Sequence, residues 1–173
     1  MKRKIHEQEV IMIQSREVQP EPLEDCLLQI NSMLRAMHLW FHAAHNTAYG
    51  MPFGSDHELY KEIYENIQDE VDSFIERSIA LTRNQSMGCP IKITSMAGKM
   101  LAALPSPSAL KGCEVSENGR DIVEAYLELL EITYEKLTAS GHMTLGLDDL
   151  VSSSASAHEE YFYHLNQRAT KER

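Results

Sequence analysis

The chain has 173 residues, of which 43% are hydrophobic, and its 26 acidic and 16 basic residues give a formal net charge of −10. This composition suits one folded domain, excludes disorder over most of the chain, and argues against a general nucleic-acid binder in favour of a protein that attracts cations. Three widely spaced cysteines without a CxxC pair (Cys26, Cys89 and Cys113) argue against a disulfide scaffold or a thiolate zinc site and favour a reduced, cytoplasmic setting.

Proline and glycine divide the chain into four long stretches and a short insert. The long stretches without these residues are Leu23–Ala48, Asp56–Arg83, Asp121–Ala139 and Asp148–Arg168, and the insert is Ile93–Leu104. Apolar residues recur at three- and four-residue steps along the first three: Leu27, Ile30, Leu34, Met37 and Phe41; Leu59, Ile63, Ile67, Val71 and Phe74; Ile122, Ala125, Leu129 and Ile132. The sequence therefore predicts an all-α fold of four long helices, with a short helix between the second and third.

Local signals refine the ends of these helices. Ser55–Glu58 has the form of a capping box, which predicts where the second helix starts. The residues from Pro105 to Gly119 are expected to form a loop. The small residues Ser152–Ala157 indicate either a close helix crossing or a flexible linker, and the absence of glycine and proline among them favours the crossing.

The second long stretch carries an acidic face beside its apolar face. On a helical wheel, the acidic face begins near His57 and holds these carboxylates: Glu58, Glu62, Glu65, Asp69, Asp72 and Glu76. Such a face is either a solvated surface or a set of cation ligands. Like charges at this spacing repel by a few tenths of a kcal/mol per pair, and bound cations would remove that repulsion. Carboxylates and imidazoles together suit iron, manganese or zinc.

Three histidines lie near the end of the first long stretch. His38, His42 and His45 share one helical face, and each alone is more often an ordinary polar histidine than a metal ligand. No histidine in the chain has a glutamate three residues before it, which argues against a metal site of the Glu-x-x-His type inside one bundle.

A longer motif joins the first two helices. The segment from His45 through Gly50 and Phe53 to His57 resembles the helix-loop-helix signature of the Dps family (DNA-binding proteins from starved cells), within the ferritin-like superfamily. Asp72-Ser-Phe-Ile-Glu76-Arg77 resembles the family's Asp-x-x-x-Glu-Arg element. The short insert and the last two helices match the family in length and order, so that the resemblance covers residues 23–167.

The resemblance implies a ferritin-like four-helix bundle that assembles into a dodecameric shell. Such a shell oxidises Fe(II) with hydrogen peroxide or oxygen at two-fold interfaces and stores ferric iron, which protects against oxidative stress. Here His45 and His57 of one subunit and Asp72 and Glu76 of its neighbour would be the ferroxidase ligands, and zinc or manganese would suit the same set. Glu58, Glu62 and Glu65 are further candidate ligands. Asp148 and Asp149 fall where the family lines its three-fold pores, with helix capping as the alternative.

Two positions depart from the family pattern. Lys61 stands where the family usually has an aspartate. Three outcomes are open: a glutamate substitutes for the missing aspartate, the lysine turns away to pair with a neighbouring carboxylate, or the metal site is weakened. With one carboxylate missing, we expect one tightly held metal ion rather than a symmetric pair. Asn46 replaces the usual tryptophan, which places oxidant handling in doubt. The alternative functions are a structural or DNA-shielding shell with a degenerate site, and a helical interaction module without a shell.

We divide the chain into an arm at 1–22, a bundle at 23–168 and a tail at 169–173. The charged N-terminus lacks a long apolar run, so we expect neither a signal peptide nor membrane association. Candidate DNA contacts are few, and we predict weak or no DNA binding at physiological salt. They are Lys2, Arg3 and Lys4 in the arm, and Arg168, Lys171 and Arg173 at the other end.

Overall fold

The computed structural model describes residues 22–50 and 53–170, and within these ranges the chain forms five α-helices and no strand. The prediction of an all-α fold is therefore confirmed. Two short 3-10 turns, at Gln85–Gly88 and Pro107–Ala109, flank α3. The helices are α1 Pro22–Thr47, α2 Phe53–Thr82, α3 Pro90–Ala102, α4 Cys113–Ala139 and α5 Leu145–Ala169.

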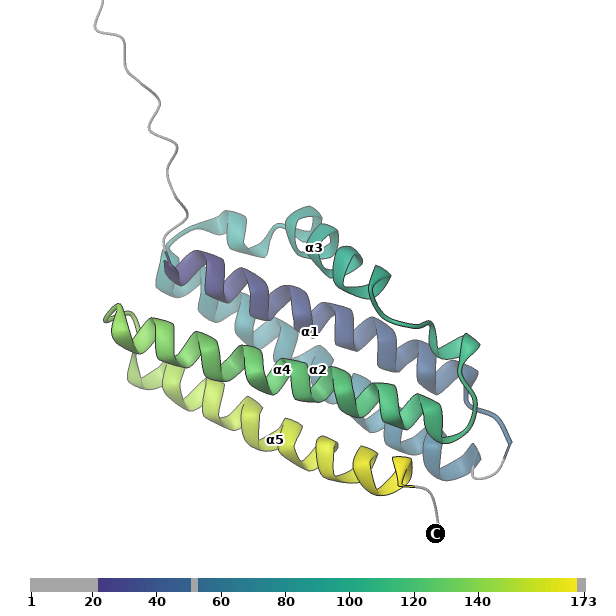
Figure 1. The fold of residues 1–173 in the computed structure, drawn as a ribbon. Helices are drawn as coiled ribbons and strands as arrows, with labels where there is room; N and C mark the ends of the chain where they lie inside the picture. Colours follow the sequence, from purple (N-terminus) through teal and green to yellow (C-terminus); the bar gives the residue numbers. More distant parts are fainter. Residues whose placement is uncertain (1–21, 51–52, 171–173) are drawn as a thin grey trace, which may run out of the picture.

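The four long helices lie side by side, and the short α3 lies along the outer side of α1 (Figure 1). The main contacts are between α1 and α2 and between α4 and α5, and further contacts join α1 to α4 and α2 to α5. The expected short helix between the second and third long helices is present. None of the helices in the described ranges is both long and apolar enough to cross a membrane.

The predicted apolar stripes of α1 and α2 lie in the core, together with other residues of all the long helices. All five predicted stripe residues of α1 are buried, and so are four of the five in α2; Leu59 is half-buried. Each such side chain stabilises the fold by about 1.5–3 kcal/mol when fully buried. The stripe predicted for α4 was partly wrong, because Ala125 and Ile132 are exposed. The buried face of α4 instead contains Gly119, Ile122, Val123, Tyr126, Leu130, Thr133 and Leu137.

Two glycines expected to break helices lie inside them. Helix α4 begins at Cys113 and passes through Gly119, where an added Cβ would lie 3.1 Å from the Phe41 ring. Helix α5 begins at Leu145 and passes through Gly146, which lies directly against the Arg77 guanidinium of α2. The predicted loop up to Gly119 and the predicted start at Asp148 were therefore wrong. Both glycines allow close packing rather than ending a helix.

The predicted caps also differ from the structure. Helix α2 begins at Phe53, two residues before the expected capping box. Helix α5 is capped by Thr144, whose hydroxyl accepts a hydrogen bond from the Leu147 amide at 3.2 Å. Asp148 and Asp149 are therefore not the cap of α5. The run of small residues lies within α5 as continuous helix, which excludes the linker.

An ion pair joins the start of α2 to the end of α5. Arg168 donates through Nε at 2.6 Å and Nη2 at 3.0 Å to the two carboxylate oxygens of Asp56, whose side chain is buried. Such a two-pronged pair is stronger and more directional than a single surface contact. The guanidinium of Arg168, which the sequence analysis named as a candidate DNA contact, is therefore engaged within the bundle.

Candidate metal centre

The turn between α1 and α2 brings the two signature histidines together. His45 lies near the end of α1 and His57 near the start of α2, and their rings are stacked with centroids 3.7 Å apart and planes tilted by 26°. The Nδ1 of His45 is 2.9 Å from the main-chain oxygen of His57, and the Nδ1 of His57 is 3.1 Å from the main-chain oxygen of His45. Each imidazole is therefore fixed by the other residue's backbone.

These reciprocal hydrogen bonds determine which ring nitrogen carries the proton. A carbonyl oxygen can only accept, so both histidines donate through Nδ1–H, and in the neutral form of each ring the lone pair is on Nε2. Both side chains are half-buried. Metal-binding histidines commonly have this arrangement, with the second ring nitrogen donating to a carbonyl that fixes the tautomer. The pair therefore fits a divalent transition metal.

The stacking limits how the pair can share an ion. A metal lies close to the plane of a coordinating imidazole, about 2.0–2.1 Å from its nitrogen. Two nearly parallel rings with centroids 3.7 Å apart do not meet at such a point. One ion bound in the plane of both rings would require one ring to turn. The ring separation is also similar to the spacing of about 3.5–4 Å between the ions of two-metal sites, so the pair also suits one ion on each ring.

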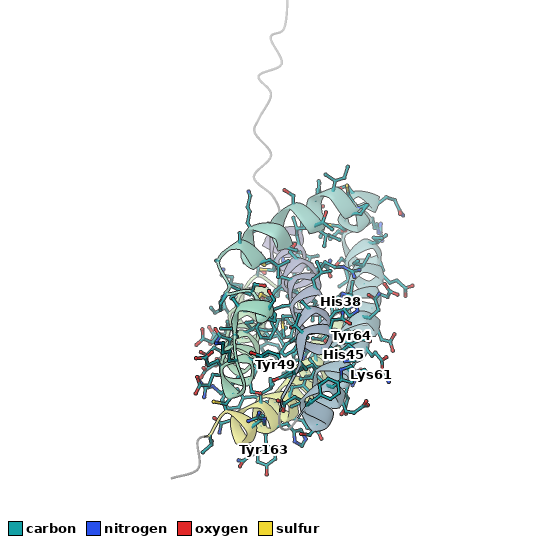
Figure 2. The ribbon with its side chains drawn as sticks, turned by 90° about the vertical axis from the view of Figure 1, so that its right-hand side faces the viewer. His38, His45, Tyr49, Lys61, Tyr64 and Tyr163 are labelled. Carbon is teal, nitrogen blue, oxygen red and sulfur yellow. The ribbon has the colours of Figure 1, made fainter. Side chains whose placement is uncertain are left out.

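Tyr64 of α2 was missed by the sequence analysis. Its ring centroid lies 4.7 Å from that of His42, 5.3 Å from that of His45 and 6.0 Å from that of His38. It therefore covers the shared histidine face of α1, and Figure 2 shows Tyr64 between His38 and His45. A signal was present in the sequence, because Tyr64 follows His57 by seven residues and so shares its helical face.

His38 differs from the signature histidines. Its Nδ1 is buried and has no hydrogen-bond partner among the described residues. Burial lowers the pKa of His38, and the charges of Arg35 and His42 lower it further. Metal binding through Nε2 would place a proton on the enclosed Nδ1, where no acceptor is available. His38 therefore suits a neutral structural role better than a ligand role.

Lys61 lies one helical turn after His57, on the same edge of the molecule as His45 (Figure 2). Its side chain is half-buried and forms no hydrogen bond or ion pair with any described residue. The expected pairing with a neighbouring carboxylate is therefore not present.

The nearby glutamates of α2 do not complete the histidine pair in one subunit. Glu58, Glu62 and Glu65 are all exposed, and in the described ranges no three His, Cys, Asp or Glu side chains are grouped so that they could hold a metal. The substitution of a glutamate for the missing aspartate is therefore not seen within the single chain.

The other predicted ligands lie far along the same helix. Asp72 and Glu76 are exposed and one turn apart on α2. Asp72 follows His57 by 15 residues, which corresponds to about 22 Å at a rise of about 1.5 Å per residue. One subunit therefore cannot bring its own histidines and these carboxylates to one ion. The site as predicted needs a second copy of the chain.

The remaining predicted site residues are distributed at the ends of the molecule. Asp149 is exposed, while Asp148 is half-buried and accepts a hydrogen bond from the Ser152 hydroxyl at 3.4 Å. The predicted basic contacts Lys2, Arg3, Lys4, Lys171 and Arg173 lie outside the described residues.

A second polar cluster, also missed by the sequence analysis, lies inside the bundle. We call it the bundle cluster: Glu70 of α2, Tyr126 of α4, and Ser154 and His158 of α5. The Ser154 hydroxyl lies 2.9 Å from the Tyr126 hydroxyl and 3.4 Å from a Glu70 carboxyl oxygen. His158 donates through Nδ1 to the Ser154 main-chain oxygen at 2.9 Å. The Nδ1 to Glu70 distance is 3.7 Å, which is too long for a hydrogen bond.

Burial keeps the bundle cluster uncharged. It raises the pKa of Glu70 to about 8, although the Ser154 hydroxyl bond acts in the opposite direction. It lowers the pKa of His158 to about 4, against the effect of the Ser154 carbonyl. We therefore describe Glu70 and His158 as a neutral pair near pH 7 rather than as an ion pair. One carboxyl group and one imidazole with an enclosed Nε2 do not make a metal site.

No protein-family model and no curated protein matches this chain. The functional assignment therefore depends on the residues themselves, above all on the His45–His57 pair, and on the order of the helices that positions it.

Proposed function

We propose that the chain is a Dps-like, ferritin-like shell subunit that oxidises Fe(II) with hydrogen peroxide or oxygen at inter-subunit sites and stores the ferric product. The observation that carries this proposal is the reciprocal histidine pair, in which main-chain carbonyls hold both Nδ1–H groups, so that a metal ion would bind through the two Nε2 atoms. Neutral imidazole is a good ligand for Fe(II), and the main-chain hydrogen bonds hold the tautomer that leaves Nε2 for the metal, although one ring must turn for both to bind the same ion.

The second half of the site would come from another subunit. Asp72 and Glu76 of the partner subunit would supply the carboxylates, because one chain holds them too far from its own histidines. Their negative charge offsets that of bound Fe(II). Each Fe(II) gives up one electron and hydrogen peroxide accepts two, so two Fe(II), one peroxide and two protons yield two Fe(III) and two water molecules.

The helix order supports the same proposal at the level of the fold. Four long helices with a short helix after the second are the order that the resemblance to Dps subunits implies, and this order supports the proposal. A shell of twelve copies would bring the two halves of each site together at two-fold contacts, where each surface meets its own copy.

A second candidate is a structural or DNA-shielding shell with a degenerate metal site. Lys61 favours it, since its ammonium lies one turn from His57 without an ion pair to any residue that the structure describes, and a positive charge there opposes cation binding. Native mass does not separate the two candidates, whereas metal binding does. A helical module without a shell is distinguished by native mass alone.

The test is complementation between two inactive variants. One variant carries His45→Ala with His57→Ala, and the other carries Asp72→Asn with Glu76→Gln. Each shell alone should lose peroxide-dependent iron oxidation. Shells reassembled from equal amounts of both should regain about a quarter of the sites, because a site then needs one wild-type half from each variant.

One control variant and a native-mass measurement accompany this test. Asp69→Asn changes an exposed carboxylate on the same helix and should leave iron oxidation unchanged. Native mass should correspond to twelve subunits. Mixed shells without recovered activity would contradict a site shared between subunits, and a monomer or dimer at micromolar concentration would contradict the shell.

A further inference from the structure

Helices α4 and α5 form an open groove of about 660 Å³ between them, which we call the α4–α5 groove. Its floor is apolar and consists mainly of Leu127, Leu130, Val151 and Ala155. Its rim is acidic, and none of the described residues that line it is basic. The rim carboxylates are all exposed: Glu124, Glu128, Glu131, Glu135 and Glu159. The groove therefore combines an apolar surface with a concentration of negative charge.

The rim carboxylates lack counter-charges. None of the five forms an ion pair or a side-chain hydrogen bond with a described residue. Four of them follow one another along α4 at steps of four, three and four residues, a spacing at which like charges repel. Lys136 is next to Glu135 in the chain, but it does not line the groove and likewise forms no ion pair with a described residue. A cationic occupant would remove this repulsion.

The shape of the groove restricts what that occupant can be. A single metal ion does not fit, because no three His, Cys, Asp or Glu side chains of the described ranges are grouped so that they could hold one. A second copy of the same face is unfavourable, since a two-fold contact would set these carboxylates against their own copies. From Glu124 to Glu135 the rim extends for about 16 Å along α4. An extended, basic stretch of chain with apolar side chains meets all these conditions.

The N-terminal part of this chain contains such a stretch. Lys2, Arg3 and Lys4 are three consecutive cations, and Ile5 follows them. Extended, the stretch Lys2–Ile5 covers about 13 Å, close to the length of the rim. The alkyl stems of lysine and arginine pack on apolar surface while their charged ends reach carboxylates beside it. Glu7 and Glu9 come next, so the attraction to an acidic surface is confined to this stretch.

The start of α1 lies within reach of the groove. Helix α1 begins at Pro22, at the end of the bundle where α4 leads into α5 (Figure 1). Burial raises the pKa of the Cys26 thiol, and Lys136 and Thr133 of α4, which lie beside it, act in the opposite direction. Lys4 precedes Pro22 by 18 residues, which span up to about 60 Å, whereas α4 is only about 40 Å long. The chain is therefore long enough to bring its basic stretch to its own groove.

We propose that Lys2–Ile5 docks in the α4–α5 groove of its own subunit. The basic head groups pair with the rim carboxylates, while their alkyl stems and the Ile5 side chain cover the apolar floor. A single exposed ion pair contributes little, so the contact depends on several carboxylates and on the apolar floor acting together. Docking holds the basic stretch against the protein and keeps it from the phosphates of nucleic acid.

The test is carbodiimide cross-linking of the full-length chain, which joins a lysine amine to a carboxylate in direct contact with it. Mass spectrometry identifies the joined peptides. Protein assembled from equal amounts of isotope-labelled and unlabelled chain shows whether both peptides come from one subunit. We expect Lys2 and Lys4 to be joined to rim glutamates in uniformly labelled pairs, with yields about tenfold above those at Glu65 and Asp69, which are exposed on α2. The yield should fall severalfold at about 1 M salt.

Charge reversal on each side assigns the contact. Glu128→Lys with Glu131→Lys should lower the yield at the remaining rim glutamates about tenfold, because like charges then face each other. Adding Lys2→Glu and Lys4→Glu to this variant should restore cross-linking, now between the new groove lysines and the new glutamates near the N-terminus.

A matched control reverses two exposed carboxylates of α2. Glu65→Lys with Asp69→Lys should leave the yield at the groove unchanged. Circular dichroism of each variant verifies folding.

Three results would overturn the inference. The first is an equal yield at the carboxylates of α2 and at those of the groove. The second is a set of joined peptides of mixed label, which would place the basic stretch on a neighbouring subunit. The third is a combined reversal that restores nothing. None of these measurements depends on metal binding at His45 and His57, so this inference and the proposed function can fail separately.

Discussion

The histidines at the turn between α1 and α2 and the histidine of the bundle cluster make the same Nδ1 hydrogen bond to a main-chain oxygen. They differ in whether Nε2 could reach a ligand. At the turn, His45 and His57 each donate through Nδ1 to a main-chain oxygen, and their side chains are half-buried. In the bundle cluster, His158 donates through Nδ1 to the Ser154 main-chain oxygen, but its Nε2 is fully enclosed and has no partner among the described residues. The hydrogen bond fixes the tautomer in both regions, and the accessibility of Nε2 then separates a candidate ligand from a core residue.

The carboxyl groups of α2 show the same division by burial. Glu70 faces the bundle interior, where burial raises its pKa to about 8. Asp72 and Glu76 lie on the exposed side of the same helix. Helix α2 thus carries an uncharged carboxyl group towards the core and, on its exposed side, the two carboxylates that we propose as ligands for a neighbouring subunit.

The largest expected effect is a loss of stability without a change in metal affinity. His158→Ala removes a buried ring from the bundle cluster, and we expect it to lower the free energy of unfolding by about 2–4 kcal/mol through the cavity that it leaves. Co(II) affinity should not change. Thermal unfolding at fixed subunit concentration, with Co(II) titration of the folded variant, measures both. A large loss of Co(II) binding in a folded variant would place His158 in the metal site.

His45→Ala, at the turn, should have the opposite effects, with a large loss of metal affinity and a small loss of stability. We expect it to reduce Co(II) affinity about 100-fold, since one of two fixed imidazole ligands is lost. It should lower the free energy of unfolding by only about 1 kcal/mol, because one hydrogen bond disappears. His164→Ala, on the exposed side of α5, is the control with unchanged affinity. Equal affinity in His45→Ala and the control would remove His45 from the ligand set.

Ser154→Ala tests the hydroxyl that joins Tyr126 to Glu70. Its removal leaves the buried Tyr126 hydroxyl without this partner, and we expect a loss of about 1–2 kcal/mol in the free energy of unfolding. Ser156→Ala, which changes an exposed serine of the same helix, should have almost no effect. If the two variants unfold at the same temperature, the bundle cluster does not stabilise the fold.

The smallest effect concerns pH. The raised pKa of Glu70 means that the folded state keeps a proton that the unfolded chain releases, so its contribution to stability is full below about pH 4.5 and is lost as pH rises through about 8. The lowered pKa of His158 has the opposite sign, with a contribution that is full above about pH 6.5 and is lost as pH falls towards about 4. The two slopes oppose each other between about pH 4.5 and 6.5, and above this only the decline due to Glu70 remains.

Glu70→Gln isolates these two contributions. It should abolish the decline in stability above pH 6.5, expected at about 1 kcal/mol per pH unit or less, and reveal the rise between pH 4 and 6.5. Thermal midpoints across this range measure the change. An unaltered decline above pH 6.5 would show that another group causes it.

The sequence predicted those features that depend on spacing along one helix. The order of helices, the core stripes of α1 and α2, and the shared face of His38, His42 and His45 all follow from a repeat near 3.6 residues. The bundle cluster did not follow, because Glu70 and Ser154 are 84 residues apart and meet only through packing. Gly119 and Gly146 misled the prediction for a similar reason. Each lacks a side chain where another helix packs closely: Gly119 against Phe41 and Gly146 against Arg77. The spacing of residues along one helix does not predict such contacts between helices.

The pair between Asp56 and Arg168 has a consequence for how the chain is made. These residues are 112 positions apart, and Asp56 immediately precedes His57. During synthesis, the buried carboxylate next to the candidate site has no counter-charge from Arg168 until the end of α5 has left the ribosome. A chain that ends before residue 168 lacks this contact, so the neighbourhood of His57 becomes complete only with the last helix. Loss of the last helix would therefore leave the buried Asp56 carboxylate without its counter-charge directly beside His57.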